Sequence, residues 1–186
     1  MVLYFTIIAI SWIILSIINI SCNIGGFLSI AMILISIIFE FAIDAIIAIV
    51  VVHFPDKWFN PDKKIFDVGK HERKFLDFIR TRKWKDKVWE LGGLGGFSKK
   101  NVKEINNSQY ITQFLVESNK GIVIHYVSVI VGFLNIFVLP FKFLWSISIP
   151  VAAVNAFLNM LSICVLRYNI PKLKVALKRA SRDNAK

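Results

Sequence analysis

Four long hydrophobic stretches constrain the fold of this chain more than any other feature. They cover about Val2–Ile20, Ile24–Val52, Ile122–Leu139 and Phe143–Leu166. The hydrocarbon core of a bilayer is about 30 Å thick, so a spanning helix needs roughly 20 mainly apolar residues. The hydrophobic share of the chain, 56%, also exceeds what a small soluble domain needs for its core. The sequence therefore predicts an all-α integral membrane protein with about four transmembrane helices.

Positive charge is concentrated in a polar block between the second and third stretches. His53–Lys120 holds 15 of the 23 Lys and Arg residues, residues 167–186 hold seven, and the short connections inside each pair of stretches hold one between them. Short cytoplasmic loops are enriched in Lys and Arg. We therefore expect a multi-pass protein of a bacterial cell membrane, with its central block and C-terminus in the cytoplasm. The ratio of 17 Lys to 6 Arg and the abundant Ile suggest an AT-rich bacterial genome.

The predicted organisation has four parts. Residues 1–52 form two transmembrane helices, residues 53–121 a basic cytoplasmic interfacial block with a glycine-rich loop, residues 122–166 two more transmembrane helices, and residues 167–186 a basic cytoplasmic tail. The first stretch lacks the basic start and small-residue cleavage site of a signal peptide, so we expect it to remain a membrane helix. The net charge of +11 fits this topology and attraction to anionic membrane lipids. Nucleic acid is not an expected partner, because the cations lie near membrane ends rather than in a recognition motif.

Several amphipathic segments are expected within and beside the block. Pro55 should end the second helix. In the helix that starts at Lys70, one apolar face would hold Phe75, Phe78 and Ile79, and Trp84 and Val88 would continue it. In a second helix, over residues 108–118, the apolar face would consist of Ile111, Phe114 and Leu115. The glycines of residues 91–97 should break the first of these helices. The tail after Pro171 is expected to form a basic helix on the membrane surface.

Two acidic residues, Glu40 and Asp44, lie inside the second hydrophobic stretch. Their i, i+4 spacing places both on one helical face. Ionisable groups at such a depth are expensive and usually face a cavity or a partner. One interpretation is a polar track into the bundle, as in an ion or lipid carrier. The other is that the acids stay protonated, or pair with a residue such as Asn155, Asn159 or Lys142, and hold helices together.

No standard catalytic motif is present, and no metal site is expected. His71-Glu72 lacks the second histidine of a zincin helix, and the glycine-rich loop matches neither a P-loop nor a dinucleotide-binding motif. The amides of Gly92–Gly96, followed by Ser98 and Lys99, would suit a phosphate, or the loop is simply a turn.

His125 stands at the entrance of the third stretch, eight residues after Glu117. It would serve as a general base with a carboxylate to orient it, or it is an interfacial ring like Tyr126.

Taken together, these residues resemble one family. The order of the matching segments is Pro55-Asp56-Lys57-Trp58-Phe59, Glu72, Trp84-Lys85-Asp86, Glu90, Gly96-Phe97-Ser98-Lys99, Glu117, His125 and Arg167-Tyr168-Asn169-Ile170-Pro171-Lys172-Leu173. Between about Pro55 and Leu173 the chain resembles the glycosyl-4,4'-diaponeurosporenoate acyltransferase (CrtO-like) family of small bacterial membrane proteins. The type member is assigned to transfer a fatty acyl group onto the sugar of a glycosylated carotenoid.

The resemblance implies a membrane-embedded acyltransferase that acylates a hydroxyl of a glycolipid or other lipid-linked acceptor at the cytoplasmic interface, as in carotenoid-like biosynthesis. Acyl-CoA or another acyl donor would be the co-substrate, no bound cofactor is expected, and the partners would be membrane lipids. The implied catalytic residues are His125, Glu117 and Glu72, and the implied substrate-binding residues are Arg82, Trp84, Lys85, Asp86, Gly96, Ser98, Lys99, Arg167, Tyr168 and Asn169. The alternative is a non-enzymatic scaffold or accessory subunit that docks on anionic lipid or on a partner protein.

Overall fold

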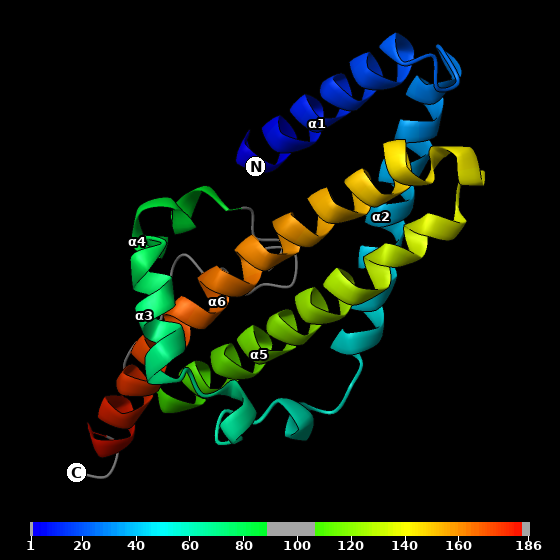
Figure 1. Cartoon of the computed structure of the whole chain (residues 1–186). Coiled ribbons are helices and arrows are strands. Elements are labelled where there is room, and N and C mark those ends of the chain that lie inside the picture. Colours follow the sequence, from blue (N-terminus) through cyan, green and yellow to red (C-terminus); the bar gives the residue numbers. More distant parts are fainter. Residues whose placement is uncertain (1, 89–106, 184–186) are drawn as a thin grey trace. The chain divides into compact units, whose positions relative to one another are not determined.

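The structure is a computed structural model that describes residues 2–88 and 107–183 (Figure 1). Among these residues every regular element is helical and none is a strand. The α-helices of the described residues are α1 (Val2–Ser21), α2 (Leu28–Val52), α3 (Lys70–Phe78), α4 (Thr81–Trp84), α5 (Ser108–Val131) and α6 (Ile149–Asp183). Short 3-10 helices cover Asp56–Phe59, Lys64–Phe66, Lys85–Lys87, Gly132–Phe137 and Phe141–Phe143, and a π-helix covers Leu144–Ser148.

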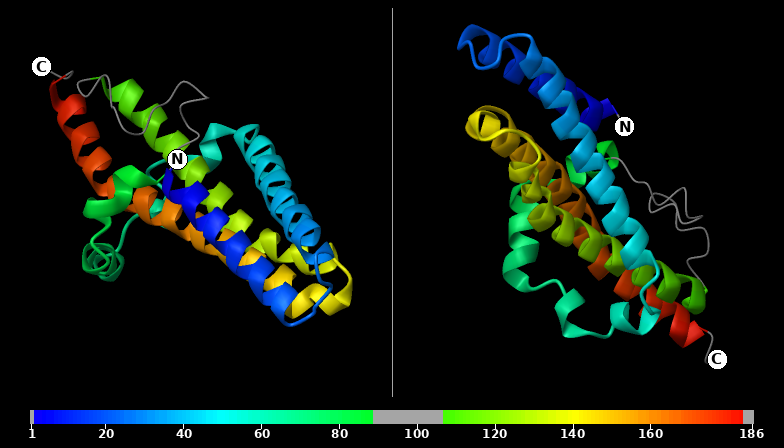
Figure 2. Two further views of the ribbon diagram at one scale, coloured as in Figure 1. Left: turned by 90° about the horizontal axis from the view of Figure 1, so that it is seen from above. Right: turned by 90° about the vertical axis from the view of Figure 1, so that its right-hand side faces the viewer.

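Four helical segments are long and apolar enough to cross a membrane, which confirms the predicted fold class. They are Leu3–Ser21, Leu28–Val52, Ser108–Phe137 and Phe141–Arg182. The third and fourth are longer than the hydrophobic stretches that predicted them. Residues 108–118 belong to the same helix as the third span, and the basic tail continues the fourth. Helix α6 is one continuous helix from Ile149 to Asp183 (Figure 1), and Figure 2 shows it from two further sides, partly covered by other helices.

The chain divides into two compact units. The first contains Met1–Val50 and Ile124–Leu161, and the second contains Val51–Val123 and Ser162–Lys186. Helices α5 and α6 each contribute one part to the first unit and a longer part to the second.

In the first unit, an apolar cluster joins α2 to the segment before α6. Its buried members are Ile33, Leu139, Phe143, Ile147 and Val151. The turn between α1 and α2 approaches this cluster at Gly25, whose φ is +84° and where an added Cβ would lie 2.7 Å from the Phe143 ring. Only glycine satisfies both conditions, so this residue allows the two N-terminal helices to fold back on each other.

In the second unit, the first half of α5 packs against the last part of α6. The buried members of this cluster are Ile111, Phe114, Leu115, Ile122, Leu166, Ile170, Leu173 and Ala180. The apolar face predicted for residues 108–118 is therefore confirmed. Leu173 and Ala180 follow Pro171 and still pack against α5, which explains why the tail continues α6 instead of forming a separate helix. Pro171 removes one backbone donor from that helix.

The helix predicted from Lys70 onward is confirmed only in part, because it stops before Trp84 and Val88, which were expected to continue its apolar face. Helix α3 ends at Phe78, and Arg80 adopts the left-handed conformation with φ 53° before α4 begins. Leu76 is the buried residue of α3, whereas Phe75 and Phe78 are 55% and 83% exposed. Leu76 lies one turn after Glu72, whose carboxylate is held by Arg167. This ion pair fixes which face of α3 turns inward, and apolar periodicity alone does not reveal it.

Candidate functional site

A row of polar side chains lies along α2 within the first unit. Ser36, Glu40 and Asp44 follow one another at four-residue spacing and so share one helical face. Ser36 donates to Asn135 Oδ1 at 2.8 Å, Glu40 Oε2 accepts from Asn155 Nδ2 at 2.7 Å, and Asp44 Oδ2 accepts from Asn159 Nδ2 at 3.2 Å. The predicted pairing of the two acids with Asn155 and Asn159 is thus confirmed.

Gly132 lets the helices come close enough for this pairing. An added Cβ at Gly132 would lie 2.9 Å from both Asn155 Nδ2 and Glu40 Oε2. Lys142, which the sequence also offered as a partner for the acids, lies instead with its Nζ 4.9 Å from the centre of the Phe143 ring.

His125 joins the same network through Asn159. Its Nδ1 lies 2.7 Å from Asn159 Oδ1. The Nδ2 atom of Asn159 lies 3.1–3.2 Å from three acceptors, which are Asp44 Oδ2, Asn155 Oδ1 and the Asn155 carbonyl. An amide nitrogen donates and its oxygen accepts. Because these three acceptors surround the Asn159 nitrogen, the Asn159 Oδ1 atom faces the His125 ring. His125 therefore donates a hydrogen bond from Nδ1–H to Asn159 Oδ1. In the neutral form of the ring, the lone pair is then on Nε2.

The arrangement resembles the part of a hydrolytic triad that orients a histidine. In such sites a side chain bonded to Nδ1–H holds the ring in one tautomer and stabilises the imidazolium that forms when Nε2 takes a proton. Asn159 occupies that position here, and Asp44 stands behind it. His125 is half-buried, whereas His53 and His71, the other two histidines, are exposed. Of the three histidines, His125 is therefore the one that is partly buried and hydrogen-bonded to Asn159.

Glu117, which the resemblance linked to His125, forms hydrogen bonds with other residues of the second unit. It accepts from Gln113 Nε2 at 3.1 Å and from Lys120 Nζ at 3.3 Å. Lys120 also pairs with Asp56 at 2.7 Å and lies 5.9 Å from the centre of the Phe59 ring. These contacts anchor the chain just after α2 to α5. A role for Glu117 in orienting His125 stays a prediction.

Arg167 and Glu72 form a bidentate ion pair in the second unit. Arg167 donates from Nε and an Nη atom to the two carboxylate oxygens at 2.5 and 2.6 Å. Its remaining donors reach the carbonyls of Asp67 at 2.9 Å and Ile65 at 3.3 Å. A bidentate pair of this kind fixes both distance and orientation. Arg167 thereby ties α3 and the segment before it to α6.

A second ion pair secures the same segment. Lys174 Nζ lies 2.5 Å from Asp67 Oδ1. The hydrogen bond and the positive charge from Lys174 hold the pKa of the Asp67 carboxyl below its ordinary value. Asp67 was not singled out by the sequence, because a carboxylate among many cations in a polar block carries no distinguishing signal.

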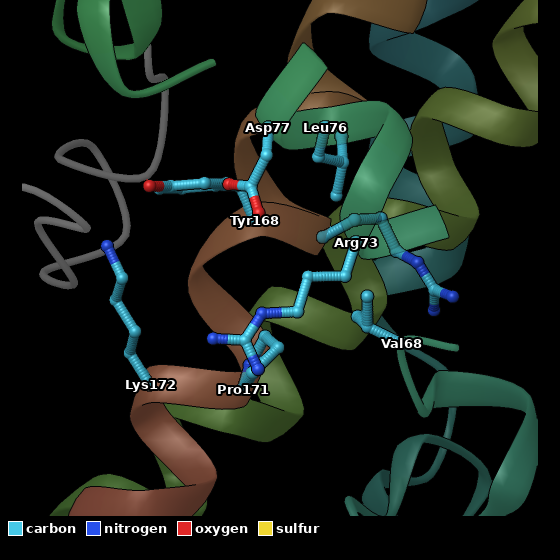
Figure 3. Close-up of a pocket in the computed structure, with 8 residues that line it drawn as sticks. Val68, Arg73, Leu76, Asp77, Tyr168, Pro171 and Lys172 are labelled. Carbon is cyan, nitrogen blue, oxygen red and sulfur yellow. The ribbon is translucent and has the colours of Figure 1, made fainter. Parts of the chain in front are cut away.

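The predicted substrate-binding residues fall in several places. Tyr168 lines an open pocket between α3 and α6 together with Val68, Arg73, Leu76, Asp77, Arg167, Pro171 and Lys172 (Figure 3). Trp84 donates from Nε1 to the Ile79 carbonyl at 2.9 Å, which braces the turn between α3 and α4.

Among the described residues of the predicted set, Arg82, Lys85, Asp86 and Asn169 do not line this pocket. Lys85 pairs with Asp86 at 3.4 Å, Arg82 is exposed and Asn169 is half-buried. Gly96, Ser98 and Lys99 lie outside the described residues, as does the glycine-rich loop. Arg73 and Lys172 line the pocket, although the sequence did not predict them as binding residues.

Comparison with known proteins identifies the family. The family model for glycosyl-4,4'-diaponeurosporenoate acyltransferase matches residues 55–179, which is more than half of the 186 residues. The match includes α3 to α5 and most of α6, and it contains His125, Asn159, Glu72 and Arg167. No curated protein and no solved structure gives a significant match. The family name implies an acyltransferase. The chain belongs to the glycosyl-4,4'-diaponeurosporenoate acyltransferase family.

Proposed function

We propose that this protein is a membrane-embedded acyltransferase that moves a fatty acyl group onto a hydroxyl of a glycolipid or other lipid-linked acceptor. The observation that carries the proposal is the hydrogen bond between His125 Nδ1 and Asn159 Oδ1, at 2.7 Å, in a chain of an acyltransferase family. It supports a histidine held in the tautomer that a general base requires. We place the reaction at the cytoplasmic interface of the membrane, because most of the basic residues would lie on that side.

In the proposed reaction, His125 Nε2 removes the proton of the acceptor hydroxyl as its oxygen attacks the acyl carbonyl carbon. The tetrahedral intermediate then expels the donor's leaving group, which is a thiolate if the donor is an acyl thioester, and the imidazolium returns the proton to it. The products are the acylated acceptor and the protonated carrier. Asn159 holds the ring through Nδ1–H during both transfers, and Asp44 holds the amide of Asn159.

The remaining predicted residues take supporting roles in this proposal. Arg82, Lys85 and Lys99 would bind anionic groups of the donor, and Trp84 and Tyr168 would flank the acyl chain or the sugar. Asp86, Gly96, Ser98 and Asn169 would line the substrate path. For Arg167 and Glu72 we propose a positioning role, because four hydrogen bonds already engage the Arg167 guanidinium with Glu72 and two backbone carbonyls.

The proposal is tested by replacing the base while keeping the fold. Cells that express the wild-type chain or His125→Gln are fed an alkyne-tagged fatty acid, and the tagged lipids are compared at matched protein levels. We expect His125→Gln to lower formation of the tagged product by about 10²- to 10⁴-fold, the usual contribution of a general base. His71→Gln, at an exposed histidine, is the control and should leave it unchanged. Unchanged product with folded His125→Gln would exclude His125 as the base.

A further inference from the structure

The pocket between α3 and α6 has the charges of an anion site, and no predicted role accounts for two of them. Arg73 from α3 and Lys172 from α6 both line it, and neither forms an ion pair with another described residue. Arg167 also lines the pocket, but its guanidinium is occupied by Glu72. Two cations from different helices thus line one pocket without a salt bridge to another described residue, and the pocket's one described carboxylate outside the Arg167–Glu72 pair is Asp77.

The walls of the pocket limit the charge of its ligand. Lys172 Nζ lies 4.3 Å from the centre of the Tyr168 ring, which holds the ammonium group at the pocket edge. Figure 3 shows the Arg73 side chain extending toward Pro171, with Asp77 beside Tyr168 on the other side. Arg73 and Lys172 together with the Asp77 carboxylate leave one net positive charge. A phosphodiester, which carries one negative charge, matches this balance better than a phosphomonoester or a diphosphate.

The surroundings of the pocket favour a membrane source for that phosphate. The pocket residue Arg167 is the first cation after the apolar part of α6, which is where a spanning helix reaches the lipid headgroups. Phe75 and Phe78, on the outer face of α3, are 55% and 83% exposed. Exposed aromatic rings next to cations are typical of segments that lie in the membrane interface. A soluble phosphate compound would gain nothing from these rings.

We propose that this pocket binds the phosphodiester headgroup of an anionic phospholipid. Arg73 and Lys172 contact the phosphate, Phe75 and Phe78 insert among the acyl chains, and Asp77 accepts a hydrogen bond from a hydroxyl of the headgroup. A glycerol headgroup, as in phosphatidylglycerol, supplies both the single charge and the hydroxyl. This binding does not depend on acyl transfer. A test of the lipid site is therefore separate from a test of His125.

The experiment measures lipid retained by the full-length protein. Protein reconstituted in phosphatidylcholine nanodiscs is titrated with phosphatidylglycerol, and binding is followed by native mass spectrometry after release. The double variant Arg73→Gln/Lys172→Gln removes the two pocket cations. The matched control Lys74→Gln/Lys178→Gln removes two exposed cations from the same two helices, outside the pocket. We expect about tenfold weaker retention for the pocket variant and little change for the control.

Two further arms identify the ligand. Asp77→Asn should reduce the preference for phosphatidylglycerol over phosphatidic acid, because the carboxylate both repels a second charge and accepts the hydroxyl. Coenzyme A and inorganic phosphate are added as soluble competitors, and neither should displace the lipid. Equal losses in the pocket and control variants would show diffuse attraction to the membrane and overturn the proposal. Displacement by coenzyme A would assign the pocket to a soluble phosphate instead and would also overturn it.

Discussion

Replacing Glu72 by glutamine should destabilise the protein, because Glu72 neutralises the buried Arg167. The side chain keeps its size, but it loses the charge that binds two donors at 2.5 and 2.6 Å. Arg167, only 8% exposed as a residue, would keep its positive charge and lose the carboxylate that binds it at two points. Breaking a fully buried ion pair costs about 3–5 kcal/mol. The Glu72 side chain is 31% exposed, so water offsets part of this cost, and we expect about 2 kcal/mol.

The assay is the apparent melting temperature of the purified protein in detergent, followed by tryptophan fluorescence. For a chain of this length, 1 kcal/mol corresponds to about 2–4 °C, so Glu72→Gln should melt about 4–8 °C lower. Arg167→Lys should also melt lower, since lysine keeps the charge but cannot form the fork that reaches Glu72 and the two carbonyls. Asp62→Asn, at an exposed carboxylate of the same unit, is the control and should not shift. A shift for Glu72→Gln no larger than that of Asp62→Asn would refute the reasoning.

Three further outcomes follow from the geometry. Asn159→Ala should lower the rate of acyl transfer by about tenfold to a hundredfold, because His125 loses the partner of Nδ1, and an unchanged rate in folded protein would contradict that role. Gly132→Ala should lower the melting temperature, because its Cβ would lie 2.9 Å from Asn155 Nδ2 and Glu40 Oε2; a neutral effect would show that the helices have room there. The lowered pKa of Asp67 means that its pair with Lys174 is present above the ordinary value of 3.8 and is lost as pH falls through the lowered pKa. Carboxyl NMR should detect a rise toward 3.8 in Lys174→Gln, and no rise would show that Lys174 is not the cause.

The sequence predicted the helices that hydrophobic length determines, but it did not predict the break between α3 and α4 or the polar contacts that hold α3. The four spans and the end of α2 before Pro55 are as expected, because bilayer thickness and proline geometry act locally. The burial of Leu76 in α3 was not predicted, because one turn before it Glu72 is held by Arg167, a residue 95 positions away. No local pattern of apolar residues contains that contact.

The candidate site shows the same division between local and distant information. The spacing of Glu40 and Asp44 predicted either a polar track or paired acids, and Asn155 and Asn159, which bind them, have the same spacing on α6. The link from Asn159 to His125 was not predicted, because both acids looked like the natural partners of the two amides. Asn159 uses its nitrogen for Asp44 and its oxygen for His125, and only the arrangement in space reveals that double role.

The central claim is that this chain transfers an acyl group, and comparative lipidomics tests it most directly. Membrane lipids of cells that carry the gene are compared with those of cells that lack it and of cells that express His125→Gln at the same level. The account predicts at least one acylated lipid that is present with the wild-type chain and absent from both other strains, with its unacylated precursor accumulating. Identical lipid profiles in all three strains, with the wild-type protein present in the membrane, would contradict it.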